Sequence, residues 1–156
     1  MAARSPSEPL IQSLRLQRRR HTGIAAWAYG HLVLALTQLG RLGEARSQLR
    51  KALLSWRADG IVHVWLHVAI RLVVAQGRMA DAMRLVGAED ASAQQFGRRD
   101  PLAESIRAES KRLIEIADPD SAMRERWRRE GEELNEASMM AMCLGEIEGV
   151  PASSPG

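Results

Sequence analysis

The hydrophobic positions of the chain form two kinds of helical pattern that follow one another twice. Residues 22–39 are apolar almost all round a helical wheel, as expected of a helix buried on several sides. Residues 43–57 instead keep their apolar side chains on one face, which is typical of an amphipathic helix. The same pair of patterns returns in residues 61–97. The sequence therefore predicts two hairpins, about 22–57 and 61–97, each with a buried inner helix and an amphipathic outer helix.

A short repeated segment marks the turn of each hairpin. Residues 40–45, Gly-Arg-Leu-Gly-Glu-Ala, return as residues 77–82, Gly-Arg-Met-Ala-Asp-Ala, which is 77 − 40 = 37 positions later. Glycine commonly ends a helix, so Gly40 and Gly77 are expected just after the inner helices. A hairpin unit of this length cannot bury its apolar face alone, and stacking of such units makes scaffolds that bind partners.

After the second hairpin the pattern changes, and three closing helices are expected at about 101–117, 120–131 and 136–148. Asp100-Pro101 is a strong helix start, with an N-cap residue followed by proline at the first helical position. The first closing helix carries one apolar stripe, formed by Leu102, Ile106, Leu113 and Ile116. The turn after the second closing helix is expected at Gly131.

The two ends of the chain have the composition of disordered segments, at residues 1–9 and 149–156. Between the N-terminal segment and the first hairpin, a short helix is predicted from Leu10 to Arg18. The helical-repeat domain is therefore expected to cover residues 10–148. The pattern favours an all-α fold of tetratricopeptide-like helical-hairpin repeats, an α-solenoid, with a short helical C-terminal closure.

Composition supports a single helical domain. The chain has 156 residues, 46% of them hydrophobic, with one Tyr and one Phe, and no alternating pattern typical of strands. The formal net charge is only +3, which is weak evidence for nucleic-acid binding. No apolar run approaches the roughly 20 residues that a membrane helix needs. One cysteine cannot form an internal disulfide, and a cytoplasmic location is expected.

The order of three segments resembles a known family. They are residues 20–28 (Arg-His-Thr-Gly-Ile-Ala-Ala-Trp-Ala), 84–90 (Arg-Leu-Val-Gly-Ala-Glu-Asp) and 127–137, which begins Trp-Arg-Arg-Glu-Gly. Together they are similar to the tetratricopeptide-like C-terminal region of LuxR-type and other ATPase-containing bacterial transcriptional regulators. The resemblance covers residues 10–148 and implies a regulatory or protein-interaction scaffold.

Two hallmarks of such regulators, a phosphate-binding loop and a helix-turn-helix, are absent from the sequence. The chain is therefore expected to be a fragment or a short form of a larger regulator. The Leu10 to Arg18 helix would then be the outer helix of a repeat whose inner helix is missing. An uncovered repeat end predicts self-association through that end, or docking on another polypeptide.

Several residues carry candidate chemistry. His63 and His67 lie one helical turn apart and are a candidate metal pair, although Val64 stands where a zinc peptidase needs Glu. The arginines of segment 15–20 (Arg15, Arg18, Arg19 and Arg20) are a candidate nucleic-acid contact. Cys143 has no basic neighbour that would activate it.

Two further groups of residues are given structural roles. A second arginine cluster, Arg124, Arg126, Arg128 and Arg129, is interleaved with glutamates that cancel much of its field. Each tryptophan lies on an apolar stripe and is expected to anchor the core: Trp27, Trp56, Trp65 and Trp127.

These observations favour a non-enzymatic interaction scaffold with no catalytic residue, cofactor or resident metal. Its partner is expected to be another protein or the upstream domains of a larger regulator. Polar residues on otherwise apolar inner helices are the predicted partner-binding positions: Tyr29, Gln38, Arg71 and Gln76. The two alternatives are a small metal-dependent protein using His63 and His67, and nucleic-acid contact through Arg15 to Arg20.

Overall fold

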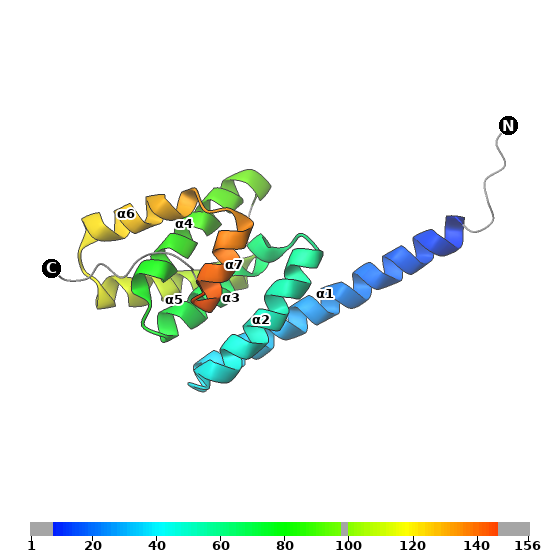
Figure 1. Ribbon diagram of the computed structural model, residues 1–156, viewed down its shortest axis with the longest axis horizontal. Helices are drawn as coiled ribbons and strands as arrows, with labels where there is room; N and C mark the ends of the chain where they lie inside the picture. Colours follow the sequence, from blue (N-terminus) through cyan, green and yellow to red (C-terminus); the bar gives the residue numbers. More distant parts are fainter. Residues whose placement is uncertain (1–7, 98–99, 147–156) are drawn as a thin grey trace.

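The structure, a computed structural model, describes residues 8–97 and 100–146, apart from the side chains of Glu8 and of residues 14–22. These residues form helices and connecting turns and include no strand, which confirms the all-α prediction. The helices shown in Figure 1 are α1 (Glu8–Gln38), α2 (Leu42–Ala58), α3 (Val62–Ala75), α4 (Met79–Phe96), α5 (Pro101–Ala117), α6 (Ser121–Glu132) and α7 (Glu136–Leu144). None of the helices in these ranges is long and apolar enough to cross a membrane.

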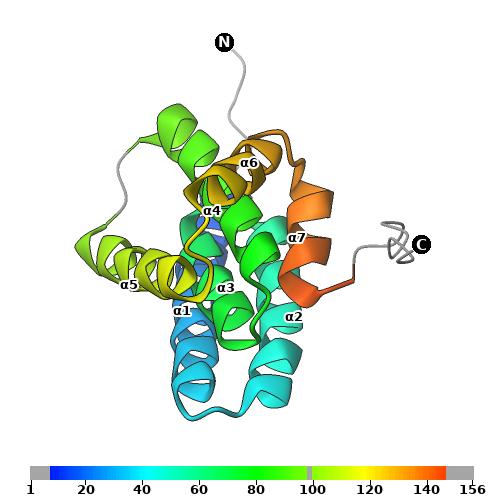
Figure 2. The ribbon, with the colours of Figure 1, turned by 90° about the vertical axis from the view of Figure 1, so that its left-hand side faces the viewer.

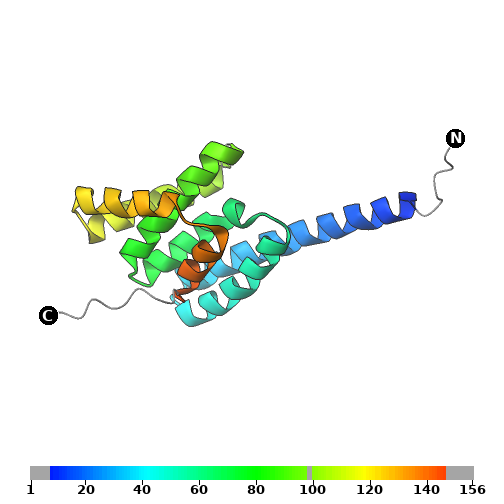
Figure 3. The ribbon, with the colours of Figure 1, turned by 45° about the horizontal axis from the view of Figure 1, so that its top comes forward.

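The first helix differs from the prediction. A short helix from Leu10 to Arg18 was expected to be separate from the inner helix of the first hairpin, but α1 is continuous from Glu8 to Gln38. It therefore also includes Glu8 and Pro9, which were expected to be disordered. The reason is local, because residues 19–21, between the two expected helices, are Arg-Arg-His and include no proline or glycine to stop helix propagation. The N-terminal part of α1 stands away from the other helices (Figures 1 and 3).

The two predicted hairpin turns have the same backbone structure. Gly40 has φ = 71° and Gly77 has φ = 77°, a conformation that glycine adopts without strain. In both turns the glycine N–H donates to the carbonyl three residues earlier, and the next N–H donates to the carbonyl five residues earlier. Arg41 and Arg78 each pair with the carboxylate three residues further on. In each copy of the repeated segment, a glycine ends one helix and the arginine after it pairs with a carboxylate in the first turn of the next helix.

The helices pack in a simple order. Helix α3 contacts both α1 and α5, α2 packs on α1, and α4 packs on α3 (Figure 2). Helix α6 lies along α4, and α7 covers the junction of α2, α3 and α4. The core lies between these helices, and its largest fully buried side chains include Trp56, Leu49, Leu53, Leu66, Ile70, Leu72, Leu85 and Ile114.

The tryptophans divide into core residues and one surface residue. Trp56 is fully buried, donates from Nε1 to the carbonyl of Ala26 at 3.3 Å, and stacks on Trp65 with ring centroids 5.6 Å apart. Trp127 is half-buried and packs against the core. The prediction was wrong for Trp27, which is 58% exposed because no other described helix covers its side of α1.

The position of Gly131 also corrects the prediction. It was expected to end the second closing helix, but α6 continues to Glu132 and Gly131 is buried inside it. A side chain there would collide with the backbone of α4, as described below. Gly131 is therefore a packing residue of the helix pair α4 and α6 rather than a turn residue.

Candidate interaction surfaces

Helix α1 has two apolar faces, of which one is covered. Its inner face carries the buried residues Ala26, Gly30, Val33 and Thr37. The opposite face, here called the outer face of α1, is exposed or half-exposed. It is formed by Leu10, Ile24, Trp27, Ala28, His31, Leu32 and Ala35, with Leu39 just after the helix. From Ile24 to Leu39 these residues include no Asp, Glu, Lys or Arg, so this part of the outer face is an apolar strip, whereas exposed Ser13 lies next to Leu10 on the same face.

Residues of the outer face of α1 can be compared with the residues of α3 that lie 37 positions later in the sequence. Ala28 corresponds to Trp65 on α3, since 28 + 37 = 65, and Ala35 corresponds to Leu72. On α3 this face is packed: Trp65 lies against Gly30 of α1, and Leu72 is fully buried. By this offset in the sequence, the outer face of α1 matches the face of α3 that packs on α1.

A second uncovered apolar face lies on α5. Leu102 is 56% exposed and Ile116 is 66% exposed, while Ile106 and Leu113 of the same stripe are half-buried. These four residues are here called the α5 stripe. The helix packs instead through a neighbouring face, formed by Ala103, Ser110 and Ile114. Small residues on that face allow close approach to α3, so the more apolar stripe is left at the surface.

Charged residues lie next to the α5 stripe. Glu109 pairs with Arg112 at 2.7 Å, and this hydrogen bond lowers the pKa of Glu109. The positive charge of Arg71 on α3 lowers the same pKa further, which places Arg71 within electrostatic reach of α5. One of the four predicted partner-binding residues therefore lies near an exposed apolar stripe that was not itself predicted to bind.

The other three predicted partner-binding residues have different surroundings. Tyr29 is half-buried and packs against the core. Gln76 accepts a hydrogen bond from Nη1 of Arg78 at 3.0 Å, in the turn between α3 and α4. Gln38 is exposed at the end of α1. The four residues were predicted from their polar character on apolar helices. That character does not distinguish a residue exposed for binding from one that forms hydrogen bonds within a turn.

The two candidate metal-binding histidines line a small cavity of about 130 Å³ between α3, α4 and the start of α5. His63 stacks on Phe96 with ring centroids 4.3 Å apart, and His67 is buried with its ring 6.0 Å from that of Trp65. Within the described ranges, no three His, Cys, Asp or Glu side chains are grouped so that they could hold a metal ion. Both imidazoles contribute to aromatic packing around the cavity.

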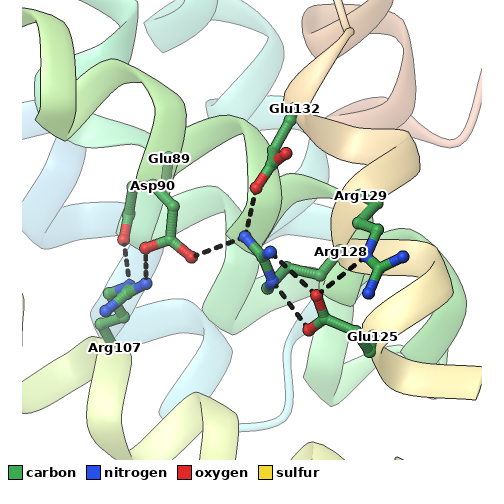
Figure 4. Close-up of polar contacts among 7 residues, drawn as sticks. All are labelled: Glu89, Asp90, Arg107, Glu125, Arg128, Arg129 and Glu132. Atoms are coloured by element: carbon green, nitrogen blue, oxygen red, sulfur yellow. Dashed lines mark hydrogen bonds and ion pairs between the residues drawn. The ribbon is translucent and has the colours of Figure 1, made fainter. Parts of the chain in front are cut away.

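Arg107 of α5 is the centre of a buried ion pair. Its side chain is 12% exposed and its Nε lies 2.7 Å from Oε1 of Glu89, whose side chain is 3% exposed. A second contact joins Arg107 to Asp90. Figure 4 shows both carboxylates of α4 pointing toward the guanidinium. Because a buried charge is costly unless it is paired, these contacts fix α5 against α4.

The second predicted arginine cluster is neutralised within the protein. Arg128 pairs with Glu125 at 2.9 Å, with Glu132, and with Asp90 at 3.9 Å (Figure 4). Hydrogen bonds from Arg128 and Arg129 lower the pKa of Glu125 to about 2, and the hydrogen bonds that Arg128 donates to Glu125 and Glu132 raise the pKa of Arg128. The expected cancellation by interleaved glutamates is confirmed for Arg126, Arg128 and Arg129. The side chains of the other cluster, Arg15 to Arg20, lie outside the described residues.

Cys143 is fully buried, and burial raises the pKa of its thiol to about 12. The thiolate is the reactive form, so this cysteine is not an activated nucleophile, as the sequence indicated. Its neighbours Met140 and Leu144 point into the core, also as expected.

These surfaces define an all-helical protein whose most distinctive features are two uncovered apolar helix faces. Comparison of the chain with models of protein families, with curated proteins and with solved structures found no match.

Proposed function

We propose that this chain is a non-enzymatic protein-interaction module built from tetratricopeptide-like repeats. In this proposal α1–α2 and α3–α4 are two copies of one hairpin unit, and α5 continues the row of inner helices α1 and α3. At Gly40 and Gly77, unlike at Gly60, the helix end is followed by an arginine that pairs with the carboxylate three residues further on, which supports the equivalence of the two units. The contacts of α3 with both α1 and α5 support the row. In stacked repeats, such a row forms a binding surface.

The observation that carries the proposal is the exposure of the α5 stripe. Apolar patches on a protein surface commonly mark interaction sites. From Leu102 to Ile116 the stripe runs over 116 − 102 = 14 residues, or about 21 Å at about 1.5 Å per residue. This is the length of a helical segment of a partner protein. We infer that an amphipathic helix of a protein partner packs on the stripe and meets the charge of Glu109, which lies midway between Leu102 and Ile116, together with those of Arg112 and Arg71.

The resemblance to LuxR-type regulators suggests the kind of process that this module serves. The partner helix would belong either to upstream domains of a larger transcriptional regulator or to a separate protein. An immunoblot of the native cell extract separates these two cases: a band near 17.3 kDa indicates a separate partner, and a much larger band indicates upstream domains. Neither alternative function is favoured by the described residues, because His63 and His67 lack a third ligand and the Arg15 to Arg20 side chains are not described.

The test is site-specific photocrosslinking in the native cell, followed by binding of the purified partner. A photoreactive side chain at Ile116 is compared with one at Glu115, its exposed neighbour on the polar side of α5. We expect a crosslinked partner from position 116 and not from position 115. Binding of that partner should fall at least about tenfold in Ile116→Glu, since a charge would be buried in an apolar contact. Equal crosslinking from both positions, or unchanged binding by Ile116→Glu, would contradict the proposal.

A further inference from the structure

A charged residue, Glu109, occupies the middle of the α5 stripe. The apolar residues Leu102, Ile106, Leu113 and Ile116 leave one gap of seven residues, and Glu109 divides it so that the five positions are spaced 4, 3, 4 and 3. This is the alternating spacing of a coiled-coil seam, in which every position faces the partner helix. A helix that packs along the stripe therefore lies with its axis about 20° from that of α5 and covers the glutamate together with the apolar residues.

The carboxylate of Glu109 is already engaged within the chain through both of its oxygens. Arg112 donates from Nε to Oε2 at 2.9 Å and from Nη2 to Oε1 at 2.7 Å. A guanidinium carries five N–H groups, so this two-point pair leaves Arg112 with further donors, on a side chain that is 59% exposed. The middle of the stripe thus offers a partner hydrogen-bond donors rather than an acceptor.

A second guanidinium adds positive charge at the same place. The hydrogen bond from Arg112 lowers the pKa of Glu109, and the positive charge of Arg71 on α3 lowers it further. Arg71, Glu109 and Arg112, here called the central triad, carry two positive charges and one negative charge. A partner helix that covers the triad removes it from water, and a covered charge is costly unless it is paired. The group that balances the triad is a carboxylate.

We propose that the partner helix carries an aspartate or glutamate in the middle of its apolar face, where this carboxylate accepts hydrogen bonds from Arg112 and Arg71. This inference rests on the proposed function, because it requires that a helix packs on the α5 stripe. The carboxylate fixes the register of the partner, since a shift by one heptad would place it against Leu102 or Ile116.

A second copy of this chain does not have the required chemistry. If two α5 stripes packed in register, in either direction, their central residues would meet, and two triads of the same net charge would face each other. Like charges placed opposite one another disfavour a wrong partner. The contact is also short, about 21 Å at about 1.5 Å per residue, which fits a transient association with another protein.

Three synthetic peptides test the charge of the partner. They are alanine-rich amphipathic helices with leucine at four seam positions spaced as in α5, and with Glu, Gln or Lys at the central fifth position. In fluorescence anisotropy we expect the Glu peptide to bind about three- to tenfold more tightly than the Gln peptide, and the Lys peptide to bind most weakly. The preference should shrink when NaCl is raised from about 0.05 M to about 0.5 M, because salt screens the attraction.

Variants of the chain test which residue provides the preference. Arg71→Gln should remove most of the difference between the Glu and Gln peptides. Lys111→Gln is the matched control, since it makes the same charge change nine residues after Leu102, on the opposite side of α5. It should leave the difference unchanged. Ile116→Glu should prevent binding of every peptide.

The outcomes separate this inference from the proposed function. Tighter binding of the Lys peptide would mean that Glu109 itself is the contact, and equal binding of the three peptides would mean that charge does not select the partner. Either result overturns the inference, as does a Glu peptide that does not bind or an equal effect of Arg71→Gln and Lys111→Gln. The proposed function is decided independently, by crosslinking of the native partner from position 116.

Discussion

Gly87 and Gly131 lie at one crossing, where each glycine faces the backbone of the other helix. A Cβ added to Gly87 would lie 1.9 Å from the carbonyl oxygen of Arg128, and one added to Gly131 would lie 1.7 Å from that of Arg84. Each contacted arginine stands three residues before the glycine of its own helix, so the contact is reciprocal. The backbones of α4 and α6 therefore touch at this point, and a salt bridge at 2.8 Å between Arg84 and Glu130 borders it.

Replacing either glycine by alanine should separate the two helices. In Gly87→Ala the new methyl group meets a backbone carbonyl, which cannot move as a flexible side chain can. We expect the free energy of unfolding to fall by about 2–4 kcal/mol, in the upper range for overpacked sites. Urea unfolding followed by circular dichroism measures this change.

The control for that experiment is Gly43→Ala on α2. No atom lies within 4 Å of a Cβ at Gly43, so alanine adds no clash there. Because Gly43 lies in the first turn of α2, where the preference for alanine is weaker than in a helix interior, this variant should keep the wild-type stability or gain up to about 0.5 kcal/mol. Equal effects of the two substitutions would mean that helix propensity, and not the close crossing, determines the result.

A second close approach joins α1 to α3. A Cβ at Gly30 would lie 2.3 Å from the six-membered ring of Trp65. We expect Gly30→Ala to lower the free energy of unfolding by about 1–3 kcal/mol, since the ring must shift in a packed core. Trp65→Leu removes the ring, so the double variant should lose less than the sum of the two single changes. A double-mutant cycle by chemical unfolding measures this coupling, and strict additivity would contradict the contact.

The sequence alone predicts the parts of this fold that depend on local patterns. The helix stops at Gly40 and Gly77 follow from glycine in the left-handed conformation, and the start of α5 follows from Asp100, whose side chain accepts from the N–H groups of Leu102 and Ala103. Both signals lie within a few residues of the structure they determine. The packing of α4 against α6 is different, because Gly87 and Gly131 are 131 − 87 = 44 residues apart.

The exposed faces could not be predicted for a related reason. Trp27 corresponds by the 37-residue offset to Val64, which is itself 46% exposed, whereas Trp65 corresponds to Ala28 and packs on Gly30. One residue along a helix turns a side chain by about 100°, so whether a tryptophan on a helix that is apolar all round is covered depends on where the neighbouring helices lie. The α5 stripe was recognised from its spacing, but its exposure follows from the packing of Arg107 and Ala103 on α4 and α3.

The buried pair of Arg107 with Glu89 should be costly to break. Arg107→Met keeps most of the side-chain volume but leaves a buried carboxylate without its guanidinium partner. We expect the free energy of unfolding to fall by about 3–5 kcal/mol. Arg112→Met is the control, since it removes an exposed partner of Glu109 on the same helix and should change stability little. A similarly small effect of both substitutions in thermal unfolding would show that Arg107 is not a structural anchor.

Cys143 should react with thiol reagents only when the protein unfolds. Its pKa of about 12 leaves a thiolate fraction on the order of 10⁻⁴ at pH 8, and the side chain is buried. Modification by Ellman's reagent should therefore be slow in buffer and fast in denaturant. Leu39→Cys in a Cys143→Ser background supplies an exposed thiol as the control. Rapid modification of native Cys143 would show that α7 opens readily from the core.

The stability contribution of Glu125 should disappear in acid. Hydrogen bonds from Arg128 and Arg129 lower its pKa in the folded protein from 4.5 to about 2. A carboxylate whose folded pKa is lowered stabilises the protein above its unfolded pKa, and this stabilisation is lost as the pH falls toward the folded value. Glu125→Gln should thus be less stable than the wild type near neutral pH, and the difference should shrink between pH 4.5 and 2. Urea midpoints of both proteins across this range measure the difference.

The control for this pH dependence is Glu115→Gln, which makes the same charge change on the exposed polar side of α5. Because Glu125 is itself exposed, the difference at neutral pH should be small and should weaken with added salt. A difference that stays constant from neutral pH to pH 2 would mean that Glu125 acts through packing and not through its charge. A stability difference between the wild type and Glu125→Gln that grows at low pH would contradict the pairing with Arg128. It would mean that the protonated form of Glu125, and not the charged form, stabilises the folded protein.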